Sequence, residues 1–199
     1  MLRKIVSDDL WKQAWQLIFE ALNTPDHPYA TPAVATTDPY GVPRLRTVVL
    51  RDAATEDQST LRCYTDIRSV KMDHLRREGA ELSWLFWDPA TKLQLTCGGP
   101  ALLVRDEERQ RIFSELPKHG RRAYATLLPP AAGLPEAQTG LPADWDERTL
   151  AETDYAEANF CVLETQLRWG EVLQLSRQGN ARLTATRAAG VWKLDWIVP

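Results

Sequence analysis

The sequence predicts a mostly β fold, an antiparallel barrel with peripheral helices that forms a single domain over residues 1–199. Three observations lead to this prediction. Short stretches in which apolar and polar residues alternate recur along the chain, and clusters of turn residues separate them. Helical patterns occur singly between these stretches and do not alternate with them as in βαβ units. The pair Gly98-Gly99 interrupts one long stretch, as happens where a barrel strand turns a corner.

The first expected element is an amphipathic helix. Apolar residues recur at spacings of three and four from Leu10 to Leu22, which is the period of one helix face. Ser7 is a suitable N-cap residue, and the acidic pair Asp8-Asp9 complements the positive end of the helix dipole. Thr24-Pro25-Asp26 ends the helix because proline cannot continue it.

The remaining elements are predicted from the same patterns. The expected strands cover 33–37, 44–51, 61–65, 81–87, 92–105, 159–164, 171–175, 181–186 and 191–198, and the further helices cover 70–78 and 106–116. The turn 38–41 joins the first two strands in a hairpin, while Ser69 and Asp106 are the expected caps of the two helices. The Pro-rich segment 127–146 has little periodicity, and we expect a surface loop or insertion there.

Tryptophan and cysteine positions bear on assembly and location. Trp84 and Trp87 have opposite parity along one expected strand, so both faces of that strand need apolar neighbours. Helices or a second subunit would supply them.

Cys63, Cys97 and Cys161 cannot all pair, and each lies in an apolar stretch. They are expected to be buried free thiols of a cytoplasmic protein.

Charge and motif content exclude several classes of function. The chain carries 24 Lys and Arg against 27 Asp and Glu, so a general affinity for nucleic acid or acidic lipid is not expected. No apolar stretch reaches the roughly 20 residues that span a bilayer. The histidines lie in separate segments without metal-ligand spacing, and the nucleophile-elbow, P-loop and dinucleotide motifs are absent. A barrel with these features takes its chemistry from a cofactor or only binds a ligand.

Cationic residues concentrate in a short span of this acidic chain. They are Arg44, Arg46, Arg51, Arg68 and Lys71. Along an ideal strand Arg44 and Arg46 share one face, and Arg51 lies on the other. An arginine fork, a lysine, the Ser69 hydroxyl and a helix N-terminus together suit a phosphate dianion. The alternative is a solvated basic patch that pairs with the neighbouring carboxylates Asp52, Glu56 and Asp66.

Three motifs carry a resemblance to a known family. They are Arg46-Thr47-Val48-Val49-Leu50-Arg51, then Tyr64-Thr65 followed by Ser69 and Lys71, then Gln94. In this order and at these spacings they resemble the pyridoxamine 5'-phosphate oxidase family, in particular its related FMN-binding proteins of undefined substrate. Arg182 and the ending Trp192-Lys193-Leu194-Asp195 extend the resemblance, which covers most of the chain outside 127–146.

The resemblance implies an FMN-binding split β-barrel of Greek-key type that forms a homodimer with FMN at the subunit interface. The implied cofactor-binding residues are Arg46, Thr47, Val48, Val49, Leu50, Arg51, Tyr64, Thr65, Ser69, Lys71, Gln94 and Arg182. In this arrangement Arg46, Ser69 and Lys71 bind the FMN phosphate, and the backbone of 47–50 runs along the ring beside 64–65. Gln94 would bind the pyrimidine edge. Arg182 of the partner subunit would approach the flavin and tune its redox potential.

The sequence departs from the oxidases mainly on the substrate side. Ile112, Leu116 and Gly120 stand where the oxidases carry a tyrosine, an arginine and a serine that hold the substrate phosphate. Gln178-Gly179-Asn180 replaces a substrate-binding R-x-H pair, and Val70 replaces an arginine of the cofactor phosphate site. The cofactor site is therefore expected to be retained and the pyridoxal-phosphate site to be lost.

The resemblance thus implies an FMN-dependent oxidoreductase whose substrate is not pyridoxamine 5'-phosphate. One alternative is an authentic pyridoxamine 5'-phosphate oxidase, in which Lys118, Arg121 or Arg122 replaces the missing arginine. A second is a non-catalytic flavin-binding carrier or redox sensor. A third is a barrel that binds haem or a deazaflavin, and haem is disfavoured because no His or Cys is well placed to ligate iron.

Overall fold

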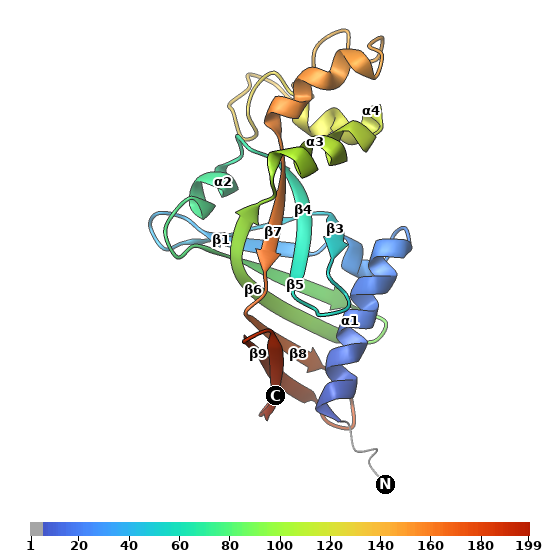
Figure 1. The fold of residues 1–199 in the computed structure, drawn as a ribbon, viewed down its shortest axis with the longest axis vertical. Helices are drawn as coiled ribbons and strands as arrows, with labels where there is room; N and C mark the ends of the chain where they lie inside the picture. The colour runs from blue at the N-terminus through green and yellow to red at the C-terminus, as the bar shows by residue number, and fades with distance from the viewer. Residues whose placement is uncertain (1–5) are drawn as a thin grey trace.

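The computed structural model describes residues 6–199, a mostly antiparallel β structure with a few helices (Figure 1). The strands are β1 (Ala33–Thr37), β2 (Pro43–Thr47), β3 (Leu50–Ala53), β4 (Thr60–Asp66), β5 (Glu81–Asp88), β6 (Leu93–Leu103), β7 (Phe160–Gln166), β8 (Trp169–Gln174), β9 (Ala181–Ala188) and β10 (Val191–Ile197). The α-helices are α1 (Ser7–Asn23), α2 (Val70–Leu75), α3 (Asp106–Glu115) and α4 (Lys118–Arg121). Short 3-10 helices cover Pro28–Ala30, Arg122–Tyr124 and Ala151–Asn159.

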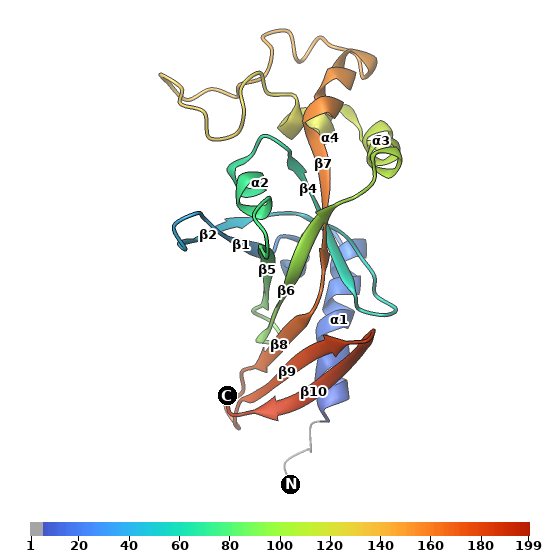
Figure 2. The ribbon, with the colours of Figure 1, turned by 60° about the vertical axis from the view of Figure 1, so that its left-hand side comes forward.

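The strands form one continuous sheet with two arms. The main order is β10-β9-β8-β6-β5-β1-β2, and the second arm runs from β6 through β7 and β4 to β3. Because the chain leads directly from β2 into β3, the six strand positions β1, β2–β3, β4, β7, β6 and β5 close a ring. The strands β8, β9 and β10 extend this ring to one side (Figure 2). The architecture is therefore split-barrel-like.

The long strand β6 belongs to both arms and bends where the glycine pair predicts. It pairs with β8 as far as Gly98 and with β7 from Ala101 onward. A Cβ atom on Gly99 would collide with the carbonyl oxygen of Gln166, and one on Gly98 would lie 2.6 Å from the Trp169 ring. Only glycine permits so close an approach of the two arms.

The predicted strand 44–51 is wrong in one respect, because it consists of the two strands β2 and β3. The chain leaves β1 at Val48, whose amide donates to the carbonyl of Pro32 at 3.0 Å, and then pairs with β4. Alternation of apolar and polar residues reports only which side of a strand is buried. It contains no information about a change of the neighbouring strand.

The main core lies between the sheet and α1. Trp11, Trp15 and Ile18 on this helix are buried against the sheet with Trp84. Trp84 is 1% exposed, whereas Trp87 on the opposite face of β5 is 39% exposed. The opposite parity of these two tryptophans is thus confirmed, and the outer face of the sheet keeps apolar side chains in solvent.

A second, smaller core lies under α3, α4 and the 3-10 helices. Its buried residues include Phe113, Tyr124, Trp145 and Phe160. The segment 127–146 contains no helix or strand, as predicted, but Trp145 near its end is buried in this cluster. The segment therefore helps to cover the second core in addition to forming surface.

The predicted caps of α1 and α3 are displaced by one residue. Ser7 and Asp106 are the first helical residues, and Val6 and Arg105 occupy the N-cap positions without a side-chain capping bond. Acidic side chains in the first turn of each helix still complement its dipole.

The three cysteines are buried and free, as expected. None of the helices between residues 6 and 199 has the length and apolar character that a membrane-spanning helix requires.

Candidate functional site

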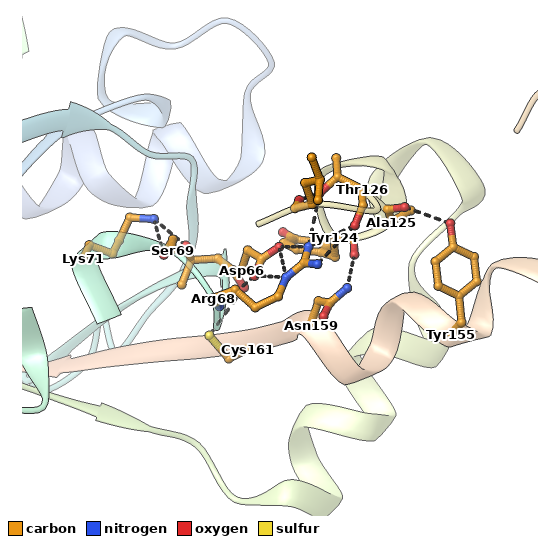
Figure 3. A network of polar contacts seen from close by, with 12 residues as sticks. Asp66, Arg68, Ser69, Lys71, Tyr124, Ala125, Thr126, Tyr155, Asn159 and Cys161 are labelled. Carbon is orange, nitrogen blue, oxygen red and sulfur yellow. Dashed lines mark hydrogen bonds and ion pairs between the residues drawn. The ribbon is translucent and has the colours of Figure 1, made fainter. Parts of the chain in front are cut away.

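Three of the predicted cofactor-binding residues, Thr65, Ser69 and Lys71, converge at the corner where β4 leads into α2. The Lys71 Nζ donates to the Thr65 Oγ1 at 2.6 Å and to the Ser69 Oγ at 3.1 Å. Thr65 and Ser69 are both buried. The two hydroxyls thus hold the ammonium group at this corner, and Figure 3 shows Lys71 beside Ser69.

Arg46 on β2 supplies the second cation of this group. Its Nη1 donates to the Thr36 Oγ1 at 2.7 Å, and burial lowers the pKa of the guanidinium. Burial is also the largest cause that lowers the pKa of the Lys71 amine, and the nearby charge of Arg46 lowers it further. Two half-buried positive charges therefore lie close enough to repel each other.

The cations of this span separate into paired and unpaired ones. Arg44 pairs with Asp38 at 2.9 Å, and Arg68 pairs with Asp66 at 2.7 Å. Within residues 6–199, neither Arg46 nor Lys71 has a carboxylate partner in an ion pair. The paired patch thus describes Arg44 and Arg68 and fails for Arg46 and Lys71, while the fifth cation, Arg51, is exposed.

Arg68 is a structural residue beside the site, and its pairing with Asp66 agrees with the paired-patch alternative for this cation. Its guanidinium bonds the Asp66 carboxylate and the carbonyl and hydroxyl of Thr126 (Figure 3). Asn159 donates to the carbonyl of Tyr124, the residue next but one before Thr126. These bonds join the β4–α2 corner, which carries Lys71, to the segment 124–126.

The predicted contribution of α2 needs two corrections. Ser69 occupies the N-cap position, but its hydroxyl makes no capping bond and accepts from Lys71 instead. The helix ends at Leu75 and not at Glu78, so it has six residues. The site accordingly depends on side chains, and a helix this short adds no separate anion site.

Gln94 and Arg182 lie together elsewhere, on the outer face of the sheet. Gln94 pairs with Trp87 on one side and with Leu173 on the other, and Leu173 pairs with Arg182. Directly opposed residues of antiparallel strands share a face, so these four side chains form one row. Arg182 also forms an ion pair with Glu171 at 2.9 Å.

The predicted cofactor residues thus form two groups. Arg46, Thr65, Ser69 and Lys71 form the cation site, while Gln94 and Arg182 form the outer row, and among the contacts of residues 6–199 none joins the two. Thr47 pairs with Ala33, which pairs with Leu85, so Thr47 belongs to the outer face.

Most of the other predicted residues lie where the chain passes from β2 into β3, the strand that pairs with β4. Val48 and Val49 form the crossing, and Leu50 is buried. The Arg51 guanidinium lies over the Tyr64 ring, 5.4 Å from its centroid. Arg51 on β3 thus contacts Tyr64 on the neighbouring strand β4.

Thr36 and His74 belong to the cation site although sequence reasoning missed them. The Thr36 Oγ1, which accepts from Arg46, lies 2.9 Å from the His74 Nδ1. The available signal was spacing, since Thr36 is in phase with buried Val34 and His74 lies three residues after Lys71.

Two of the residues compared with the oxidases' substrate-phosphate contacts lie in apolar packing. Ile112 and Leu116 pack against the second core. Arg121 is 3% exposed, and its guanidinium donates to the Asp154 carboxylate and to backbone carbonyls. Lys118 donates to the carbonyl of Asp146 and lies over the Trp145 ring.

The fold is a split-barrel-like sheet, and the cation site is a candidate site for an anion. Residues 9–105 match the family model described as pyridoxamine 5'-phosphate oxidase, FMN-binding domain. The matched part of the chain contains the whole cation site and Gln94. No curated protein matches the sequence.

Solved structures share the fold over the whole chain. A pyridoxamine 5'-phosphate oxidase-related, FMN-binding protein of Nostoc punctiforme is 21% identical with a TM-score of 0.73, covering 99% of this chain and 100% of its own. PhzG of Burkholderia lata, solved with tetrahydrophenazine-1-carboxylic acid, is 15% identical with a TM-score of 0.72, covering 100% and 98%. A Clostridium acetobutylicum protein related to general stress protein 26 is 12% identical with a TM-score of 0.51, covering 89% and 95%.

Proposed function

We propose that this protein binds FMN and is an FMN-dependent oxidoreductase. The observation that carries the proposal is the pair of half-buried cations, Arg46 and Lys71, which has no carboxylate to neutralise it within residues 6–199. Buried charges are unfavourable unless a counter-charge is present. The terminal phosphate of FMN is such a counter-charge, and the matched family model is of an FMN-binding domain.

Each residue of the cation site has a separate task in this proposal. Arg46 offers its planar fork to two phosphate oxygens, while Lys71 acts as a point charge. Ser69 and Thr65 hold the ammonium group in place. Bound FMN supplies the hydride and electron transfer that these side chains cannot perform.

A homodimer would complete the site. The outer sheet face exposes Leu45, Leu85 and Trp87, which are 66%, 37% and 39% exposed. Gln94 and Arg182 lie on this same face, away from the cation site of their own protomer. A second copy packed on this face would cover the apolar side chains and bring its Gln94 and Arg182 to the flavin.

We further propose that the substrate is not pyridoxamine 5'-phosphate. An authentic oxidase needs a cation to replace the missing arginine at Leu116. Arg121 cannot do so, because its guanidinium is already bonded to Asp154 and to carbonyls of the second core. The same fold in PhzG holds tetrahydrophenazine-1-carboxylic acid, which has no phosphate, so the fold itself does not require a phosphorylated substrate.

We expect the protein to bind FMN at least about tenfold more tightly than riboflavin, because one charge-assisted bond contributes about 1.5–3 kcal/mol and 1.4 kcal/mol is tenfold. Fluorescence titration of the flavin-free protein with FMN, riboflavin and FAD measures this preference. Equal affinity for riboflavin and FMN would reject a phosphate site. Bleaching of the loaded protein by NADH or NADPH, with recovery in air, separates an oxidoreductase from a non-catalytic flavin carrier.

The dimer gives a second expected result. We predict that Leu45→Glu converts a dimer to a monomer and weakens FMN binding about tenfold or more, because the partner's contacts are lost. Light scattering coupled to gel filtration measures the mass. Leu127→Glu is the matched control, since Leu127 is also 66% exposed but lies off the outer sheet face. A flavin-loaded monomer of the unmodified protein at micromolar concentration would contradict the proposal.

A further inference from the structure

Thr36 and His74 are buried polar residues beside the cation site for which the proposed flavin contacts give no role. Thr36 on β1 is 2% exposed, and His74 on α2 is 4% exposed. Lys71 and His74 are three residues apart on α2, so their side chains lie on the same face of that helix. A buried hydroxyl and a buried imidazole each need a hydrogen-bond partner, and here they find one in each other.

The Arg46–Thr36 hydrogen bond has a fixed direction, whereas that of the Thr36–His74 bond depends on the histidine tautomer. A guanidinium can only donate, so the Thr36 Oγ1 accepts from the Arg46 Nη1 at 2.7 Å. The hydroxyl proton of Thr36 is then available to the His74 Nδ1 at 2.9 Å. In that direction the imidazole carries its proton on Nε2, and in the other tautomer Nδ1–H donates to the Thr36 Oγ1, which accepts both bonds. In either tautomer Thr36 links Arg46 to His74 through two hydrogen bonds.

This chain of bonds opposes a repulsion that would otherwise move Arg46 away. The positive charge of Arg46 lies close enough to Lys71 to affect its protonation, and the long arginine side chain can rotate into solvent. The bond to Thr36 holds one Nη1 hydrogen and leaves the other donors of the fork for an oxyanion. A site that is already ordered loses less entropy when its ligand binds.

We propose that Thr36 and His74 are positioning residues that hold Arg46 beside Lys71 in the flavin-free protein. The phosphate of FMN then meets a preformed pair of cations. This inference rests on the proposed FMN site and adds to it the two residues that set the phosphate affinity. Neither residue is proposed to touch the flavin.

The test compares the affinities for FMN and for riboflavin, because their ratio isolates the contribution of the phosphate. Thr36→Val keeps the side-chain shape and removes the hydroxyl, and we expect it to lower the ratio about tenfold. Thr36→Ser restores the hydroxyl and should keep the ratio within about twofold of the unmodified protein. Riboflavin affinity should stay the same in both variants. Thr37→Val is the matched control, since Thr37 is the exposed neighbour.

A second pair of variants tests the imidazole. His74→Gln retains an oxygen acceptor for the Thr36 hydroxyl and should preserve the ratio, whereas His74→Leu should lower it. Both residues line a cavity of about 500 Å³, which leaves room for these replacements. This pair also decides the question if Thr36→Val does not fold.

The outcomes distinguish this inference from the proposed function. If the unmodified protein prefers FMN and neither Thr36→Val nor His74→Leu changes the ratio, the positioning role is wrong and the FMN site stands. Equal losses for FMN and riboflavin would indicate a purely structural role and would also overturn the inference. If the unmodified protein shows no preference for FMN, both the phosphate site and the positioning role are wrong.

Discussion

Replacing Lys71 by Met is expected to weaken FMN binding by about 10- to 150-fold and to leave riboflavin binding unchanged. The lost charge-assisted bond contributes about 1.5–3 kcal/mol, and each 1.4 kcal/mol corresponds to tenfold. The double variant Arg46→Met with Lys71→Met should lose more than either single change. The two losses are not expected to add, because the residues are neighbours. Titration with each flavin measures the effect.

Lys71→Met is expected to weaken FMN binding but not to lower the stability of the flavin-free protein. Burial lowers the pKa of Lys71 below its ordinary 10.5, so the unfolded chain binds a proton more readily than the folded one. This contribution therefore destabilises the flavin-free fold at low pH and is relieved as the pH rises from the folded pKa toward 10.5. Lys71→Met should remove it, so that the flavin-free variant is at least as stable as the unmodified protein near neutral pH.

Thermal melts of the two flavin-free proteins across this pH range measure the difference. A large loss of stability in Lys71→Met, together with equal losses of FMN and riboflavin binding, would mean that Lys71 is a structural residue. In that case the cation pair would not be an anion site.

Pyridoxamine 5'-phosphate is expected to be oxidised poorly or not at all by the FMN-loaded protein. A phosphorylated substrate must exchange its hydration for protein donors. Ile112 and Leu116 instead pack against the second core, and Gly120 has no side chain to donate. Losing two charge-assisted bonds lowers affinity by a factor of about 100 to 10,000.

Steady-state oxidation at micromolar substrate is the measurement. A turnover of about 0.1 per second or more, near the range of ordinary enzymes, would restore the authentic oxidase. Chemical reduction of the same sample and its recovery in air is the control, because it establishes that the bound flavin is active when the vitamer is not oxidised.

Much of the fold could be predicted because its signals are local. Alternation along 81–87 and 191–198 predicts β5 and β10, and the three- and four-residue spacing predicts α1. The strand 44–51 was predicted as one element because nothing local marks the change of partner at Val48 and Val49. Register and partner choice depend on residues far away in the chain.

The candidate site divides in the same way. The motifs of the sequence select Arg46, Ser69 and Lys71, which lie within the range 9–105 of the family match. They did not reveal Thr36 or His74, because a threonine in a strand and a histidine in a helix are ordinary residues until tertiary contact brings them together. Arg68, which the sequence counts among the concentrated cations, is bonded to Asp66 and Thr126.

By itself the sequence determined the antiparallel fold, the corner at Gly98-Gly99 and the span that holds the cations. Only the tertiary structure decided which cations are free. Arg44 and Arg46 are two residues apart on one strand, yet Arg44 meets Asp38 at the hairpin turn, while the partner of Arg46 among residues 6–199 is the hydroxyl of Thr36. The physical reason is that a charge is neutralised by whatever lies within a few ångströms of it in space, and the fold alone sets those distances.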